Sequence, residues 1–197
     1  MRTFIAIELP PEIQKTLSRY QNKLKRTGID VKWVEDKNIH LTLKFIGEIN
    51  ENQLHSIIQA LREISRIHAG FEITLSSIGA FPGIQSPRVI WAGISKGDAE
   101  IKNLAREIEK RISALGFQKE TREFSSHITL GRTRSSSGKE EFKKIIPDIN
   151  NAFSAESIGC VIKEIILFKS TLTPRGPIYE AVEKFGLVLE GITSNGK

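Results

Sequence analysis

Apolar residues recur every three or four positions in several segments of the chain, which is the spacing of one buried helix face. Pro10 and Pro11 stand at the start of the first of these segments and Gly28 follows it, an arrangement typical of the two ends of a helix. Pro147 interrupts the last segment and is expected to end it, because a proline inside a helix removes a backbone hydrogen bond. The pattern predicts helices over residues 11–27, 51–68, 98–115 and 139–146.

Shorter segments between these helices carry the patterns of β-strands. In residues 71–75 apolar and polar side chains alternate, and residues 89–92 form a compact apolar run. Two late segments flank the turn-forming residues 173–176, which predicts a hairpin. The predicted strands are residues 2–8, 71–75, 89–92, 158–168 and 178–189, together with the two stretches that begin at His40 and His127.

The mixture of helices and strands, with several connections of hairpin length, favours an α+β fold with a largely antiparallel sheet. No linker or low-complexity tract divides the 197 residues. We therefore predict one domain over residues 1–197.

Composition and charge narrow the class of protein. Apolar residues make up 39% of the chain and charged residues 26%, as in an ordinary folded protein. No stretch reaches the ~20 apolar residues of a membrane span, the N-terminal apolar run ends too early at Glu8 for a signal peptide, and Cys160 is the only cysteine. We therefore expect a cytoplasmic protein with no disulfide and no membrane partner. The net charge of +6 favours nucleic acids as partners.

Two of the four histidines stand in the same local setting. Residues 40–43 read His-Leu-Thr-Leu and residues 127–130 read His-Ile-Thr-Leu. Because side chains alternate across a strand, the histidine and threonine of each stretch share one face, and the two apolar residues share the other. If the fold brings the two strands together, two imidazoles and two hydroxyls line one pocket.

That set of groups suits cleavage of a phosphodiester without a metal. One neutral histidine takes a proton from the nucleophile, and one protonated histidine gives a proton to the leaving oxygen. The hydroxyls of Thr42 and Thr129 can donate hydrogen bonds to the non-bridging oxygens, where negative charge builds up in the transition state.

Two other interpretations of the histidines remain. Both rings can be ordinary hydrogen-bonded residues of a sheet. The second interpretation is a zinc site. Zinc normally needs at least three protein ligands, however, and neither stretch carries an acidic residue or a second histidine at ligand spacing. We therefore expect no metal and no other cofactor.

The chain resembles the two-histidine phosphoesterases, and within them the RNA 2′,3′-cyclic phosphodiesterases, also called 2′-5′ RNA ligases (LigT/ThpR-like). The similarity extends over nearly the whole sequence. It is carried by residues 1–7 (MRTFIAI), 32–34 (KWV), 40–47 (HLTLKFIG), 81–82 (FP), 87–93 (PRVIWAG), 127–132 (HITLGR) and 176–179 (GPIY).

The resemblance implies a fold of two pseudo-symmetric lobes, with outer helices and an active-site cleft between the sheets. It implies hydrolysis of a terminal 2′,3′-cyclic phosphate on RNA to a 2′-phosphomonoester, and a reversible 2′-5′ ligation that joins tRNA halves. It further implies that His40 is the proton donor, that His127 is the proton acceptor, and that Thr42 and Thr129 hold the phosphate. We expect such an enzyme to act as a monomer.

Two alternatives to this function stay open. The same basic surface suits an RNA-end-binding module with little turnover, although pure binding would be served as well by arginine and lysine. The same chemistry also suits a cyclic phosphodiesterase that acts on small nucleotides instead of RNA.

Neighbouring residues of the two stretches carry further expectations. Arg132 falls on the face opposite His127 if alternation is strict, and it reaches the phosphate only if the strand ends or bulges at Gly131. Lys44 shares the face of His40 on the same reasoning, and we expect a solvated lysine there. Aromatic residues that can offer stacking surfaces to a base are Trp33, Phe81 and Trp91, of which Trp91 is expected mainly to pack in the core.

Overall fold

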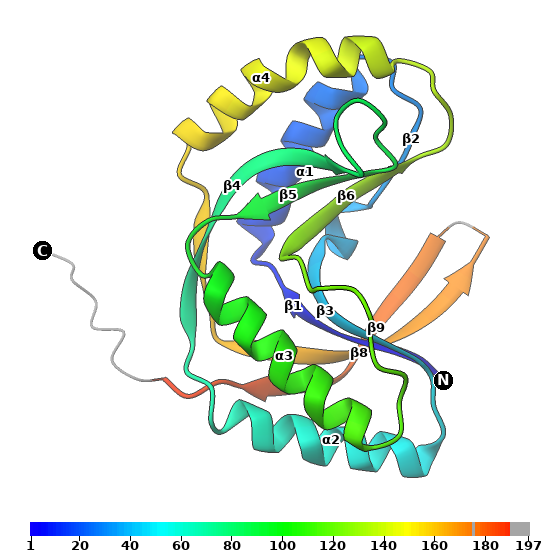
Figure 1. Cartoon of the computed structure of the whole chain (residues 1–197), viewed down its shortest axis with the longest axis vertical. Coiled ribbons are helices and arrows are strands. Elements are labelled where there is room, and N and C mark those ends of the chain that lie inside the picture. The colour runs from blue at the N-terminus through cyan, green and yellow to red at the C-terminus, as the bar shows by residue number, and fades with distance from the viewer. Residues whose placement is uncertain (175, 190–197) are drawn as a thin grey trace, which may run out of the picture.

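Two antiparallel sheets, each covered on one face by helices, make up the fold of the computed structural model (Figure 1). The structure describes residues 1–174 and 176–189, and within them the first sheet has the strand order β3-β1-β8-β9 and the second the order β2-β6-β5-β4-β7. The elements are β1 (Arg2–Glu8), α1 (Pro11–Lys25), β2 (Val31–Trp33), η1 (Asp36–Asn38), β3 (His40–Glu48), α2 (Glu51–Ser65), β4 (Phe71–Phe81), β5 (Val89–Ile94), α3 (Asp98–Ala114), β6 (His127–Thr133), α4 (Lys139–Ala155), β7 (Gly159–Ile162), β8 (Glu164–Thr173) and β9 (Gly176–Gly186). The predicted α+β class with antiparallel sheets is confirmed.

The chain crosses repeatedly between the two sheets. β1 and β3 lie in the first sheet while β2 lies in the second, and the chain returns to the first sheet with β8 and β9. In Figure 1 α2 and α3 cover the lower sheet, and α1 and α4 cover the upper one. Neither sheet is therefore built from one continuous segment of the chain.

Each sheet buries the face that its helices cover. In the first sheet Ile5, Ile7, Leu41 and Leu43 belong to the main hydrophobic core, as the alternation of side chains requires. The opposite face, which carries no helix and which we call the open face, holds a separate apolar cluster of Phe4, Ala6, Ile166 and Phe168.

The prediction that Pro147 ends the fourth helix is wrong. α4 continues through Pro147 to Ala155. Its apolar stripe buries Phe142 and Phe153 almost completely, and the side chain of Asn150 exchanges two hydrogen bonds with the backbone of Ile78 in β4. Packing against the second sheet thus outweighs the hydrogen bond that the proline removes.

The prediction of one strand over residues 158–168 is also wrong, because the structure has two strands there. β7 ends at Ile162 in the second sheet, and β8 begins at Glu164 in the first. Lys163 and Glu164 interrupt the apolar residues of this segment, and Lys163 lies at the crossing between the two sheets. The hairpin that was predicted around residues 173–176 is confirmed in the pairing of β8 with β9, although Arg175 itself lies outside the described residues.

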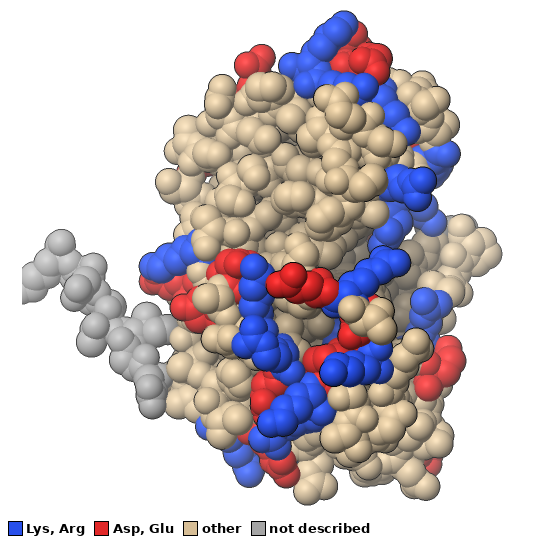
Figure 2. Space-filling model, in the orientation of Figure 1, with Lys and Arg blue, Asp and Glu red and all other residues tan. Residues whose placement is uncertain are grey.

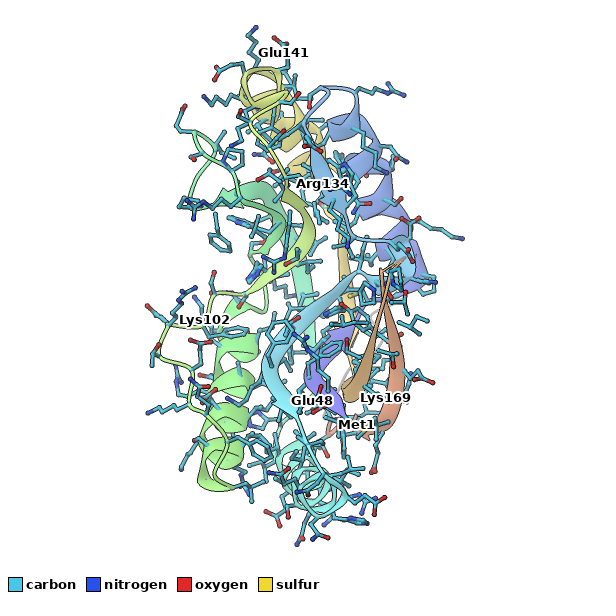
Figure 3. All side chains as sticks on the ribbon, turned by 90° about the vertical axis from the view of Figure 1, so that its right-hand side faces the viewer. Met1, Glu48, Lys102, Arg134, Glu141 and Lys169 are labelled. Carbon is cyan, nitrogen blue, oxygen red and sulfur yellow. The ribbon has the colours of Figure 1, made fainter. Side chains whose placement is uncertain are left out.

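Charged side chains are spread unevenly over the surface. Figure 2 shows lysine and arginine mixed with acidic residues over the lower lobe, whereas lysine and arginine gather along the right-hand edge of the upper lobe, beside a recess in front of the β8–β9 hairpin. The exposed basic residues of β2, β6 and the loop after β6 include Lys32, Arg132 and Arg134. Figure 3 looks onto this side, with Arg134 in the upper lobe and Met1, Glu48 and Lys169 in the lower one. None of the described helices is long and apolar enough to cross a membrane.

Candidate active site

The two His-x-Thr stretches occupy the first residues of equivalent strands. His40 begins β3 in the first sheet, and His127 begins β6 in the second. β3 and β6 approach each other across the two sheets, as Figure 1 also shows. Both histidines and both threonines are half-buried, while the apolar residues between them are fully buried. The alternation that the sequence predicts for these four residues is confirmed.

A β-bulge follows each threonine at the same place. In β3 the pairing with β1 passes from Thr42 opposite Ala6 to Lys44 opposite Ile5, so Leu43 has no partner. In β6 the pairing with β5 passes from Thr129 opposite Trp91 to Gly131 opposite Ile90, so that Leu130 has none. An extra residue reverses the alternation beyond it, and the two strands therefore carry the same irregularity at the same distance from their histidines.

The second bulge brings Arg132 to the open face. It lies opposite Lys32 of β2, and both side chains are exposed. From the sequence, Arg132 was expected to reach the phosphate only if the strand ends or bulges at Gly131. The structure has a bulge at this place. The position equivalent to Arg132 in the first sheet is Phe45, which is 68% exposed. The two lobes thus present a guanidinium on one side and an aromatic ring on the other.

The expectation that Lys44 is a solvated residue on the face of His40 is wrong. The first bulge turns Lys44 to the covered face, where it is only 6% exposed. Its ammonium lies 2.6 Å from a carboxylate oxygen of Glu109 in α3. Simple alternation misplaced this residue because a bulge is not visible in the apolar pattern.

Both histidine rings are held by a carbonyl two residues earlier. Nδ1 of His40 lies 2.7 Å from the carbonyl oxygen of Asn38, and Nδ1 of His127 lies 2.8 Å from that of Ser125. A carbonyl only accepts hydrogen bonds, so Nδ1 carries the proton in each ring. Nε2 is then the atom that exchanges a proton, and in His40 it lies 3.0 Å from Oγ1 of Thr42.

Aromatic rings surround His40. The ring centres of Phe4 and Tyr179 lie 5.0 Å and 5.3 Å from that of the imidazole. Burial lowers the pKa of His40 below its ordinary value, while the hydrogen bond to Asn38 and the negative charge of Glu8 act in the opposite direction. His127 has one aromatic neighbour in the described residues, Phe81, whose ring stands perpendicular to the imidazole at 5.1 Å.

Glu8 offers a direct test of this balance. Glu8→Gln removes the negative charge that favours the imidazolium form, so the pKa of His40 should fall further. The titration of the His40 Cε1 proton, followed by NMR, should move to lower pH in this variant. Glu164→Gln is the matched control, because Glu8 and Glu164 both accept from Lys184 and only Glu8 acts on His40. An unchanged titration in Glu8→Gln, or an equal shift in both variants, would contradict the assignment.

Tyr179 belongs to the same site, although the sequence drew attention to it only through the resemblance. Burial raises the pKa of its phenol, and the positive charges of Arg2 and Arg132 lower it. Arg2 comes from β1 of the first sheet and Arg132 from β6 of the second, so the open faces of the two sheets meet near this ring. A cavity of about 120 Å³ adjoins it, and its lining includes Arg2, Phe4, Phe45 and Tyr179.

The three aromatic residues that the sequence offered as stacking surfaces are placed differently. Trp91 lies opposite Thr129, and its indole packs over Gly79 and against Phe81, so these two rings are near the second histidine. Trp33 lies opposite Gly131 and packs against the main core, which removes it from the open face. Among the described residues, more aromatic rings lie around His40 than around His127, and the sequence did not single out those near His40 as stacking surfaces.

Within residues 1–174 and 176–189, no three histidine, cysteine or acidic side chains gather as metal ligands do. His55 lies exposed on α2, where its Nδ1 bonds to the carbonyl of Glu51.

Comparison with known proteins bears on the same residues. The family model described as LigT-like phosphoesterase matches residues 7–91 and again residues 94–179, so that each match contains one His-x-Thr stretch. The RNA 2′,3′-cyclic phosphodiesterase of Methanocaldococcus jannaschii is 37% identical over 185 residues, which cover 94% of this chain and all of that protein. The protein of the same name from Thermotoga maritima is 37% identical over 182 residues, which cover 92% and 93% of the two chains.

Solved structures agree with this result. TT0787 of Thermus thermophilus superposes with a TM-score of 0.77 at 26% identity, covering 97% of this chain and 100% of that one. LigT of E. coli, crystallised with 3′-AMP, gives a TM-score of 0.73 at 23% identity over 94% and 97% of the two chains, which shows the shared fold. The chain belongs to the LigT-like phosphoesterase family.

Proposed function

We propose that this protein hydrolyses the 2′,3′-cyclic phosphate at the 3′ end of RNA to a 2′-phosphomonoester. The observation that carries the proposal is the matched pair of imidazoles. Each has Nδ1–H bonded to the carbonyl two residues before it, which leaves Nε2 as the atom that can exchange a proton. The names of the relatives at 37% identity point to the same substrate.

The proposed reaction needs one acid and one base. Nε2 of His127 takes a proton from water, and the water oxygen attacks phosphorus. The bond between phosphorus and O3′ breaks, and Nε2 of His40 gives its proton to the leaving O3′. The hydroxyls of Thr42 and Thr129 and the guanidinium of Arg132 donate to the non-bridging oxygens as their charge grows. These groups complete the hydrolysis, and we propose that no metal takes part.

The same site can join RNA ends. If the 5′-hydroxyl of a second RNA takes the place of water, the product is a 2′-5′ phosphodiester, and the reverse step restores the cyclic phosphate. tRNA halves carry suitable ends for this reaction. We propose ligation as a second outcome of the same chemistry, performed by a monomer in the cytoplasm.

The assignment of His40 as proton donor fits the surfaces around the two histidines. The donor must lie next to O3′, so the terminal ribose and its base should lie on the side of His40. That side offers the exposed ring of Phe45 and the half-buried ring of Tyr179, and Phe45 lies 6.0 Å from the buried ring of Phe4. The side of His127 carries the exposed side chains of Lys32 and Arg132 in addition to the rings of Phe81 and Trp91, and their positive charges suit phosphate.

The activity itself is tested with a short RNA that ends in a 2′,3′-cyclic phosphate, incubated with the protein in the presence of EDTA. We expect a 2′-phosphomonoester as the product. Formation of no phosphomonoester at any pH would refute the enzyme and leave an RNA-end-binding module. Equal turnover of cyclic mononucleotides and RNA would instead favour a small-nucleotide substrate.

Phe45→Ala tests where the base lies. The side chain is largely exposed, so its removal should cost little stability, whereas a lost stacking surface for a base should raise KM for short RNA by about 10-fold with little change in kcat. Ile67→Ala is the control, since Ile67 is 63% exposed and lies just after α2. Steady-state kinetics give the answer, and an unchanged KM in Phe45→Ala would place the base elsewhere.

A further inference from the structure

Lys44 carries a buried charge on the strand that holds the first His-x-Thr stretch. Its side chain is 4% exposed, and its ammonium donates to Oε2 of Glu109 at 2.6 Å and to the carbonyl of Gln118 at 3.2 Å. A buried ammonium is costly unless it is paired and hydrogen-bonded. Both partners lie outside the first sheet, so the strand of His40 is tied to α3 and to the loop that follows it.

Glu109 extends this tie along the loop. Its second oxygen, Oε1, accepts from the backbone N–H of Glu120 at 3.1 Å. The loop is therefore held at two backbone groups, one by Lys44 directly and one by the carboxylate that Lys44 neutralises. Between these points and on to Glu123, the side chains are exposed.

The loop over residues 115–126 ends at His127. Figure 1 shows it rising from the lower end of α3 to the start of β6. Phe117 and Phe124 pack against the main core at its two ends, and Ser125 supplies the carbonyl that holds Nδ1 of His127. The position of that carbonyl depends on the position of the loop.

We infer that Lys44 and Glu109 are positioning residues for His127, an inference that rests on the proposed function. They hold the loop so that the Ser125 carbonyl keeps the imidazole in the tautomer and orientation that proton transfer requires. The equivalent residue in the second bulge is Gly131, which has no side chain for such a contact. The segment before His40 is instead held by Asn38, whose amide donates to the carbonyl of Pro177 at 3.2 Å.

Single substitutions alone cannot separate this role from a structural one. Lys44→Met or Glu109→Gln leaves an uncompensated polar group in the interior, so both should lower the melting temperature and the turnover. The double variant Lys44→Met/Glu109→Met removes both charges and restores an apolar contact. Its melting temperature should therefore recover.

The double variant decides between the two roles. If the pair positions the loop, turnover stays about 10- to 100-fold below that of the wild-type protein at a temperature where both are folded, because neither Gln118 nor Glu120 regains its partner. The NMR resonance of His127 should then shift and broaden while that of His40 stays unchanged, and trypsin should cut faster after Lys119 and Arg122. Wild-type turnover in the double variant, or an undisturbed His127 resonance and loop, would overturn the inference.

A control on the same helix completes the test. Glu107→Gln removes a carboxylate that pairs with Arg111 within α3 and has no hydrogen bond or ion pair to the loop among the described residues. It should leave turnover, the His127 resonance and tryptic cleavage unchanged. If the wild-type protein hydrolyses no cyclic phosphate, the proposed function fails, and the resonance and cleavage measurements still decide whether the pair holds the loop.

Discussion

Replacement of either site histidine by alanine should lower turnover of the cyclic phosphate by about 10²–10⁴-fold, the usual contribution of a positioned acid or base. In the proposed mechanism, His40→Ala removes the proton for the leaving oxygen, and His127→Ala removes the acceptor that activates water. Both rings are half-buried, so the fold should survive either change. Single-turnover kinetics with saturating protein separate this loss from weaker binding.

The double variant and a third histidine sharpen this prediction. In the proposed mechanism both rings serve the same displacement at phosphorus, so His40→Ala/His127→Ala should lose much less than the product of the single effects. His55→Ala is the control, because His55 is exposed on α2 and bonds only to its own helix among the described residues. A single variant that keeps full turnover would remove its histidine from the mechanism.

Replacement of the site threonines by valine should produce the second largest loss, about 10²–10³-fold in kcat for each. Valine keeps the shape of the side chain and removes the hydroxyl. If the hydroxyl stabilises charge that develops only in the transition state, kcat falls while KM changes little. The measurement is the steady-state rate of each variant over a range of substrate concentrations.

The two threonines should not behave identically. Oγ1 of Thr42 also contacts Nε2 of His40, so Thr42→Val should in addition alter the NMR titration of His40. Thr129→Val should leave that titration unchanged. Thr171→Val is a control on an exposed strand position. A raised KM with an unchanged kcat in the site variants would show that the hydroxyls bind substrate and transition state equally.

The environments of the two histidines differ more than their sequences do. His40 is enclosed by rings, and burial lowers its pKa, whereas His127 follows an exposed loop. A proton donor with a lowered pKa gives up its proton readily but is protonated in a smaller fraction of molecules at neutral pH. The negative charge of a bound phosphate would raise that fraction, which couples substrate binding to the protonation that the reaction needs.

Much of the secondary structure could be predicted from local patterns. The helices that start at residues 11, 51 and 98 follow their apolar stripes, and Asn50 and Gln53 form the capping box that their spacing indicates. Pro147 misled the prediction because its local cost is offset by packing on β4, which no local pattern contains. Lys163 likewise gave no local signal of a crossing between two sheets, since apolar residues lie on both sides of Lys163 and Glu164.

The residues of the candidate site likewise fall into those that local patterns predict and those that only tertiary contacts place. The sequence by itself determined that His40 and Thr42 share one face of their strand, and that His127 and Thr129 share one face of theirs. Alternation along a strand is a local property of the backbone. Only the tertiary structure decided that a bulge turns Arg132 and Phe45 to the open face and buries Lys44, and that Tyr179 lies beside His40. These placements depend on which strands pair and in what register, and that is set by contacts between residues far apart in the chain.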